Sequence, residues 1–175
     1  MDAGTPDQLS AVDSSTCLLP TALTSYYDGD HAPATTSVGG NDLYQDVNQL
    51  DRSGTLTITR TWNDGSVRSC TPALPACGTP GAVTVATIAS ELAAIDVQAA
   101  FAVSPMSIYG LDDRLQGGAV YAIARDDLRI LYVGSPCTSM SSSSCQPVPS
   151  GVQRLSDGLK SLVSTALGDP ACSGL

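Results

Sequence analysis

Three consecutive side chains, Asp112, Asp113 and Arg114, carry the chemistry that is easiest to recognise in this chain. Paired carboxylates can divide the work of acid and base, but in glycosidases they normally come from separate elements and lie in a cleft rich in aromatic residues. This chain has only one Trp, six Tyr and one Phe. We therefore interpret Asp112 as a carboxylate that fixes its loop by pairing with Arg114. A small hydrolase using Asp112 and Asp113 is kept as the second alternative function.

His31 is the only histidine, so any Ser-His-Asp or Cys-His scheme would have to use it. It lies in a turn-rich loop, and the sequence contains no G-x-S-x-G elbow. Asp28 and Asp30 beside it form a candidate metal cluster, but calcium takes about six to eight oxygen ligands and the full D-x-D-x-D-G loop is missing. Gly117-Gly118 is not part of a G-x-G-x-x-G motif between a strand and a helix, which a nucleotide site would need. The sequence therefore predicts no catalytic residue, no cofactor and no metal.

Six cysteines form an even set without any C-x-x-C pair, which favours a disulfide framework over a zinc site. Disulfides persist in oxidising compartments, so we expect a periplasmic, cell-surface or secreted protein. Spacings of C-x6-C and C-x7-C suit local bridges, and the last two cysteines would pair by elimination. Many other pairings are open to six cysteines. The predicted set joins Cys70 to Cys77, Cys137 to Cys145, and Cys17 to Cys172.

The loop between Cys137 and Cys145 is the strongest candidate for a binding segment. A loop that is closed at its base loses little entropy when it docks. A plain surface loop is the alternative interpretation. The candidate residues are Ser139, Met140, Ser141, Ser142, Ser143 and Ser144.

The net charge of −9 bears on the class of partner. Nucleic-acid binding needs a basic surface, and docking on anionic lipid needs one too, so neither class fits. No stretch approaches the roughly 20 apolar residues of a membrane span, so we expect no direct insertion. Sixteen of the seventeen acidic residues are Asp, which places the acidity in loops. We expect a protein partner. The acidity is typical of soluble loops encoded by a GC-rich genome, and adaptation to salt or a basic partner is the alternative interpretation.

The N-terminal region is expected to be irregular. Residues 1–16 are polar and read as a flexible tether, with Met1 as a start codon on a mature chain. This tether resembles the segment after the lipidated Cys of bacterial lipoproteins, which would imply a lipid anchor in the native precursor. Residues 17–175 are predicted to form one disulfide-stabilised domain, with an extension at 17–54 and a core at 55–172. Within the extension, an edge strand or ordered loop is predicted at 17–27, and a helical turn or a strand at 43–50.

The core has four predicted strands and two predicted helices. Residues 55–62 alternate in polarity, and the turn at Asn63-Asp64-Gly65 leads to a second strand. Two further β-prone runs, at 119–125 and 128–133, are joined by Asp126 and Asp127. This β-β-α-β-β-α order predicts an α+β fold, an antiparallel four-stranded sheet with two helices on one face.

The two helices are predicted from apolar stripes at helical spacing. The first covers residues 84–95. The second begins at Ser150, whose side chain forms a capping box with Gln153. Gly158 lies inside the second helix, where glycine costs about 1 kcal/mol relative to Ala, so a close packing contact is expected there. The stripe of the second helix consists of Val152, Leu155, Leu159, Leu162, Val163 and Ala166.

This order of elements resembles the emfourins, small bacterial inhibitors of thermolysin-type metalloproteases. The matching features are T-L-T-I-T-R at 55–60, the helix around Leu92, the hairpin at 119–133 and the helix at 149–167. The resemblance implies a protease inhibitor whose loop or strand edge, beside the 55–71 hairpin, occupies the protease cleft. The six cysteines, the long N-terminal extension and the absence of a glycine-rich turn after the first strand depart from the pattern.

The stretch I-Y-G-L-D-D-R at 108–114 and P-S-G-V at 149–152 also resemble cysteine-bearing bacterial surface lipoproteins of unknown function. Taken together, these features lead us to expect an extracytoplasmic, non-enzymatic binding module of a bacterium. The emfourin-type inhibitor is the first alternative.

Overall fold

The computed structural model describes residues 17–28, 43–95, 108–110, 121–126, 130–134, 137 and 145–175. The predicted tether at 1–16, His31 and Asp30 lie outside the described residues, as do the whole candidate binding loop and the acidic cluster of Asp112, Asp113 and Arg114. Their predicted roles therefore stay predictions.

The described strands form one seven-stranded sheet, and six of them are antiparallel where the sequence predicted an antiparallel sheet of four. In sheet order they are β4 (Val67–Cys70), β3 (Leu56–Trp62), β2 (Leu43–Leu50), β1 (Leu23–Asp28), β6 (Tyr121–Arg125) and β7 (Ile130–Val133). The two-residue β5 (Ile108–Tyr109) pairs with β7 in parallel. The irregular extension predicted at 17–54 is thus wrong where β1 and β2 lie. A strand is among the alternatives predicted for 17–27 and for 43–50, but β1 is a central strand and not the predicted edge strand. The two strands join the two predicted hairpins. Without these two strands, both hairpins would have an inner edge with unpaired backbone groups.

The α+β class and the two predicted helices are confirmed. α1 (Val85–Ala94) begins with a capping box, in which Thr84 Oγ1 accepts from Thr87 N and the Thr87 side chain accepts from Thr84 N. α3 (Ser150–Ala166) differs at its start, because its N-cap is Pro149 and no side chain caps the helix. The predicted Ser150 capping box is therefore wrong. Gln153, its second member, donates instead to Asp157 Oδ1 one turn further along the helix (2.9 Å).

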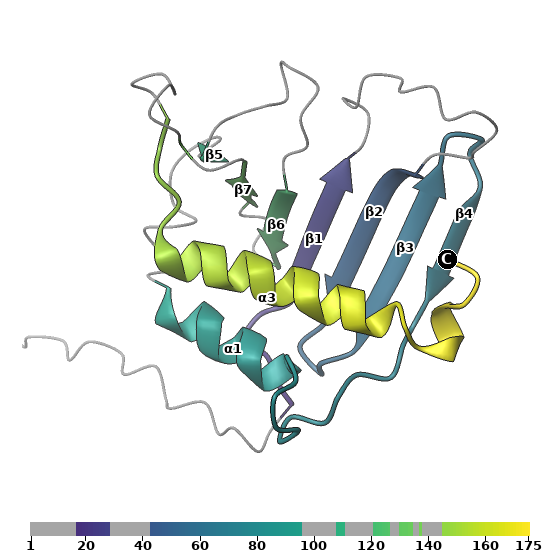
Figure 1. Ribbon diagram of the computed structural model, residues 1–175, viewed down its shortest axis with the longest axis horizontal. Coiled ribbons are helices and arrows are strands. Elements are labelled where there is room, and N and C mark those ends of the chain that lie inside the picture. The colour runs from purple at the N-terminus through teal and green to yellow at the C-terminus, as the bar shows by residue number, and fades with distance from the viewer. Residues whose placement is uncertain are drawn as a thin grey trace, which may run out of the picture.

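Both helices cover one face of the sheet, which we call the covered face. Figure 1 shows α3 running across the strands with α1 beside it. The close packing predicted at Gly158 is confirmed, since a Cβ there would lie 3.0 Å from Ile88 Cδ1. Arg154 Nε also donates to Glu91 Oε2 across the two helices (2.7 Å). The largest fully buried side chains of this layer and the sheet are Leu23, Leu50, Leu56, Ile58, Val85, Ile88, Leu92, Ile123, Leu131, Val152, Leu155 and Leu162.

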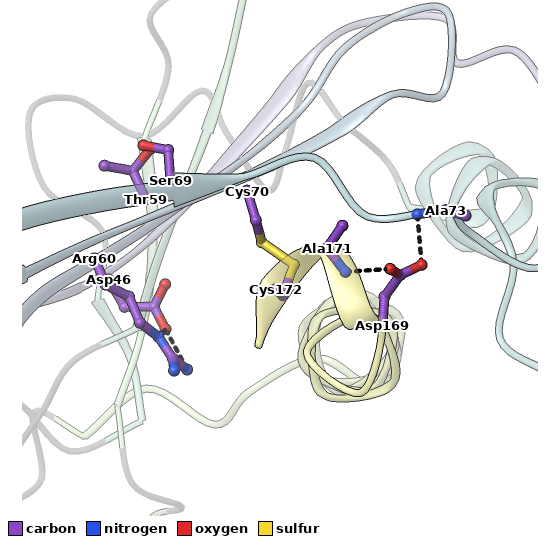
Figure 2. Close-up of a disulfide and its surroundings, with 9 residues drawn as sticks. All are labelled: Asp46, Thr59, Arg60, Ser69, Cys70, Ala73, Asp169, Ala171 and Cys172. Carbon is purple, nitrogen blue, oxygen red and sulfur yellow. Dashed lines mark hydrogen bonds and ion pairs between the residues drawn. A yellow bond between two sulfur atoms is a disulfide. The ribbon is translucent and has the colours of Figure 1, made fainter. Parts of the chain in front are cut away.

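The disulfides join Cys17 to Cys77, Cys70 to Cys172, and Cys137 to Cys145. The third pair was predicted, whereas the predicted pairing of Cys70 with Cys77 and of Cys17 with Cys172 is wrong. The reason lies in the pleat of β4, which directs Cys70 to the covered face. There it meets the 3-10 helix η2 (Pro170–Cys172) that follows α3 (Figure 2).

Two glycines in turns of the sheet provide a matched test of backbone packing. Gly54 has φ +84° in the turn between β2 and β3, and a Cβ there would lie 2.6 Å from the backbone oxygen of Cys17. Gly65 has φ +79°, with no atom within 4 Å of the same added Cβ. Gly65→Ala should therefore cost only the strain of a left-handed residue, about 1 kcal/mol.

Gly54→Ala should cost about 2 kcal/mol more than Gly65→Ala, because the Cys17 segment must move away. Urea unfolding of the oxidised variants measures both free energies. Equal losses for the two variants would show that the approach of Cys17 to Gly54 contributes nothing.

Candidate functional site

The second face of the sheet, which we call the open face, is not covered by any helix of the described chain. Pleating sends alternate residues to opposite faces, and Figure 2 shows Thr59 and Ser69 on the side away from Cys70 and η2. Strand register assigns the rest of the face. The open-face residues with described side chains are Thr24, Tyr26, Gln45, Val47, Gln49, Thr57, Thr59, Thr61, Val67, Ser69, Ala122, Ala124 and Tyr132, and the same register puts the strand-end positions Asp28 and Ile130 on this face.

The β4 edge is the second exposed feature of the sheet. Trp62 N donates to Ser66 O (3.0 Å), and this bond fixes the alternation of the antiparallel ladder. The backbone N–H and C=O groups of Arg68 therefore bond to those of its register partner Arg60. The N–H and C=O groups of Val67 and Ser69 point away from β3. The Thr59 and Ser69 hydroxyls lie 2.9 Å apart, as expected for a pair without backbone bonds, whose side chains approach closely. Four backbone groups thus face outward from β4.

The side chains on β4 differ between its two faces. Val67 is 60% exposed and lies on the open face. Arg68 lies on the covered face, where its Nη1 donates to Gly174 O (2.6 Å) and its guanidinium is 5.4 Å from the centre of the Trp62 ring. An extended chain added to this edge would therefore meet an apolar side chain on one face and a cation on the other.

A buried polar cluster lies on the covered face of β1 and β2, and no pattern in the sequence indicates it. Ser25 and Asn48 are register partners, and Asp46 is two residues from Asn48 on the same face. Arg60 Nε lies 3.4 Å from Asp46 Oδ2, while Asp46 Oδ1, Asn48 Oδ1 and Ser25 Oγ are buried without a hydrogen-bond partner. The cluster has a single carboxylate, so it does not provide the acid and base pair of a hydrolase.

Asp126, predicted as a turn residue, joins three segments that are distant in sequence. Its Oδ1 accepts from Thr21 Oγ1 (2.6 Å), and its Oδ2 accepts from Arg52 Nε (2.9 Å). The Thr21 hydroxyl, followed by the Arg52 guanidinium, lowers the pKa of Asp126 to about 2. This carboxylate fixes the start of β1 and the turn between β2 and β3 to the end of β6.

The base of the predicted binding loop is described, although the loop itself is not. Cys137 and Cys145 are joined, and Gly110 N donates to Gln146 O directly after the bridge (2.6 Å). Gly134 N donates to Tyr109 O (2.8 Å), so both ends of the loop are attached to the β5 and β7 edge.

No group of three or more His, Cys, Asp or Glu side chains in the described residues could hold a metal ion. No described helix is both long and apolar enough to cross a membrane.

The low pKa of Asp126 predicts how stability depends on pH. A carboxyl whose pKa falls from 3.8 to about 2 on folding stabilises the folded state above pH 3.8, and this contribution is lost as the pH falls through about 2. Asp126→Asn should therefore be less stable than the wild type at neutral pH, and the difference should shrink below pH 3.8. Urea unfolding across the pH range measures it.

A carbon-detected NMR titration of the same carboxyl is the control. Thr21→Val removes the first-ranked hydrogen bond and should move the midpoint back toward 3.8. A wild-type midpoint already at 3.8 would contradict the role of Asp126.

No protein-family model matches this chain, and comparisons with curated proteins and with solved structures find no significant match.

Proposed function

We propose that this chain is an extracytoplasmic, non-enzymatic binding module of a bacterium, which captures a protein partner by adding an extended segment of it to the β4 edge. The observation that carries the proposal is the outward direction of the N–H and C=O groups of Val67 and Ser69. Strand addition to an exposed sheet edge is a recurrent mode of peptide recognition, in which backbone bonds give affinity and alternate side chains give specificity.

The side chains around this edge define the segment that fits. A residue beside Val67 on the open face should be apolar, because Val67 is 60% exposed. The next residue of the partner points to the covered face beside Arg68, where an Asp or Glu would be favoured. The four backbone bonds contribute about 0.5–1.5 kcal/mol each, so these side-chain contacts decide which partner is held.

A second copy of the chain fits the edge less well than a different protein does. Reciprocal bonds between Val67 of one copy and Ser69 of the other would place the two Arg68 side chains directly opposite each other, and like charges at such positions repel. Each copy also carries a net charge of −9, which opposes self-association. A partner with a basic surface around the docked segment would gain from the same charge.

The three disulfides fit an oxidising environment outside the cytoplasm. Within that environment we propose a periplasmic, cell-surface or secreted protein, with a lipid anchor in its precursor as one way of holding it at a membrane. The polar residues 1–16 would then separate the domain from the anchor.

Selection of random octapeptides displayed on phage against the oxidised chain tests the β4 edge. Ser69→Pro removes an outward N–H without removing a backbone bond to β3. Ser69→Ala is its matched control, because it keeps the backbone and, like Ser69→Pro, loses the hydroxyl bond to Thr59. Enriched peptides should bind the wild type and Ser69→Ala equally. They should bind Ser69→Pro more weakly by about tenfold or more.

Two results would overturn this assignment of the edge. One is the failure of any peptide to enrich. The other is equal binding of the enriched peptides to Ser69→Pro, when the amide NMR shifts that change on adding peptide belong to residues away from β4.

The emfourin-type inhibitor is a second candidate, favoured by the position of the free edge. The edge belongs to the β3–β4 hairpin, whose turn residues Asn63, Asp64 and Gly65 are exposed. Titration of a thermolysin-type protease should then remove its activity at a stoichiometric ratio while the chain stays uncut, and Ser69→Pro should inhibit less. Full protease activity at excess of intact chain would exclude this candidate for that protease and leave peptide capture standing.

A further inference from the structure

Arg68 on β4 is an arginine whose contacts include no carboxylate. Its Nη1 donates to Gly174 O, and its guanidinium lies over the Trp62 ring. No group of the described chain accepts a hydrogen bond from its Nε or Nη2. Its positive charge is thus unpaired within the described residues, although the chain has a net charge of −9. The arginines that the structure pairs with an acid are Arg52 with Asp126, Arg60 with Asp46, and Arg154 with Glu91.

The strand register adds a repulsion to this unpaired charge. Arg68 lies directly opposite Arg60 on the covered face, and like charges at such positions repel. The nearest described carboxylate, Asp46, is on the far side of Arg60, with Oδ2 3.4 Å from Arg60 Nε (Figure 2). Asp46 therefore balances the charge of Arg60 and leaves that of Arg68. An anion brought to Arg68 would complete the charge pairing of this row.

Two contacts hold the Arg68 guanidinium in place while the residue stays exposed. They are the 2.6 Å bond to Gly174 O and the position 5.4 Å from the centre of the Trp62 ring. A side chain that is already held loses less freedom when a ligand binds. The planar edge formed by Nε and Nη2 matches the two oxygens of a carboxylate, which it can bind through two parallel hydrogen bonds. Arg68 is therefore arranged to receive a carboxylate.

We infer that Arg68 determines specificity at the β4 edge, and that the extended segment it selects carries a Glu opposite it. This inference rests on the strand addition proposed above. Val67 and Ser69 would supply the backbone bonds to an added antiparallel strand, so the residue opposite Arg68 is in a pair without backbone bonds, whose side chains approach closely.

The position of the guanidinium favours Glu over Asp. Trp62 belongs to β3, which lies on the other side of β4 from the added strand. The guanidinium is therefore directed away from the added strand, and the longer side chain of Glu reaches it better. In the antiparallel direction, the next residue of the segment lies opposite Val67, which is 60% exposed on the open face. The selected pattern is thus a Glu followed by an apolar residue.

Repeating the octapeptide selection with charge variants of Arg68 tests this inference. Peptides selected on the wild type should carry a Glu at one fixed position, followed by an apolar residue. Arg68→Gln should still select peptides, but without the Glu, and Arg68→Glu should select Lys or Arg at that position. Arg154→Gln is the matched control, because it removes the same charge from an exposed position on α3 and should select the same Glu as the wild type.

Calorimetry with one selected peptide, and with its Gln and Asp versions at the Glu position, measures the size of the effect. The wild type should bind the Glu peptide about tenfold more tightly than the Gln peptide, with the Asp peptide in between. Arg68→Gln should bind the three peptides with affinities that differ by about twofold or less. Trp62→Leu removes the ring that positions the guanidinium, and should reduce the ratio of the Glu and Gln affinities, which a general loss of folded protein would not change.

The outcomes separate the role of Arg68 from capture at the β4 edge. Peptides that bind Ser69→Pro more weakly but show no preference for Glu would leave capture at β4 standing and overturn the role of Arg68. An equal preference for Glu in the wild type and in Arg68→Gln would also overturn it, since another cation would then bind the Glu. Failure of any peptide to enrich would overturn both proposals.

Discussion

Burial of one face of the sheet by α1 and α3 is the interaction on which the rest of this structure depends. Leu50, Leu56 and Ile123 are almost fully buried against Ile88 and Leu155 of the two helices, and burying each such side chain stabilises the fold by about 1.5–3 kcal/mol. The helical layer is present on one side of the described sheet only. The opposite face carries no described helix, and the outermost strand, β4, has an edge that no described strand pairs with. The β4 edge that we assign to binding results from this two-layer arrangement.

The disulfides and the segment around η2 fasten this layer to the outer strand of the sheet. Cys70 on β4 is bonded to Cys172 across a separation of 102 residues, and closing so long a loop stabilises the folded state by about 4–5 kcal/mol in the chain-entropy account. Asp169 strengthens the same junction, because its two oxygens accept from Ala171 N (2.7 Å) and Ala73 N (3.0 Å) (Figure 2). β4 is thus held from its covered face and from its two ends, while its outward backbone groups stay available.

The sequence was sufficient for those elements whose pattern is local. The β3–β4 turn, the β6 and β7 strands and both helices follow from alternation, turn residues and apolar stripes. The central position of β1 and β2 was not predicted, because Ser25, Asp46 and Asn48 lie on their covered face and interrupt the apolar alternation that identifies a buried strand. The pairing of Cys70 was missed for a related reason: it depends on which face of β4 the side chain enters and on what the end of α3 brings there. The sequence does not decide which edge of the 55–71 hairpin is exposed. In the structure β4 is outermost because β2 pairs with the other edge of β3.

The strand register relates the core to the open face and to the β4 edge. Because side chains alternate with a period of two, a slip of one residue between β2 and β3 would turn Leu56 and Ile58 outward and bring Thr57 and Thr59 under the helices. Burial of the leucines therefore sets the position of every open-face hydroxyl. The same ladder decides that Val67 and Ser69, and not Arg68, present their backbone groups at the edge. The core of this protein thus determines both the positions of the polar side chains on the open face and the pattern of hydrogen-bonding groups along β4.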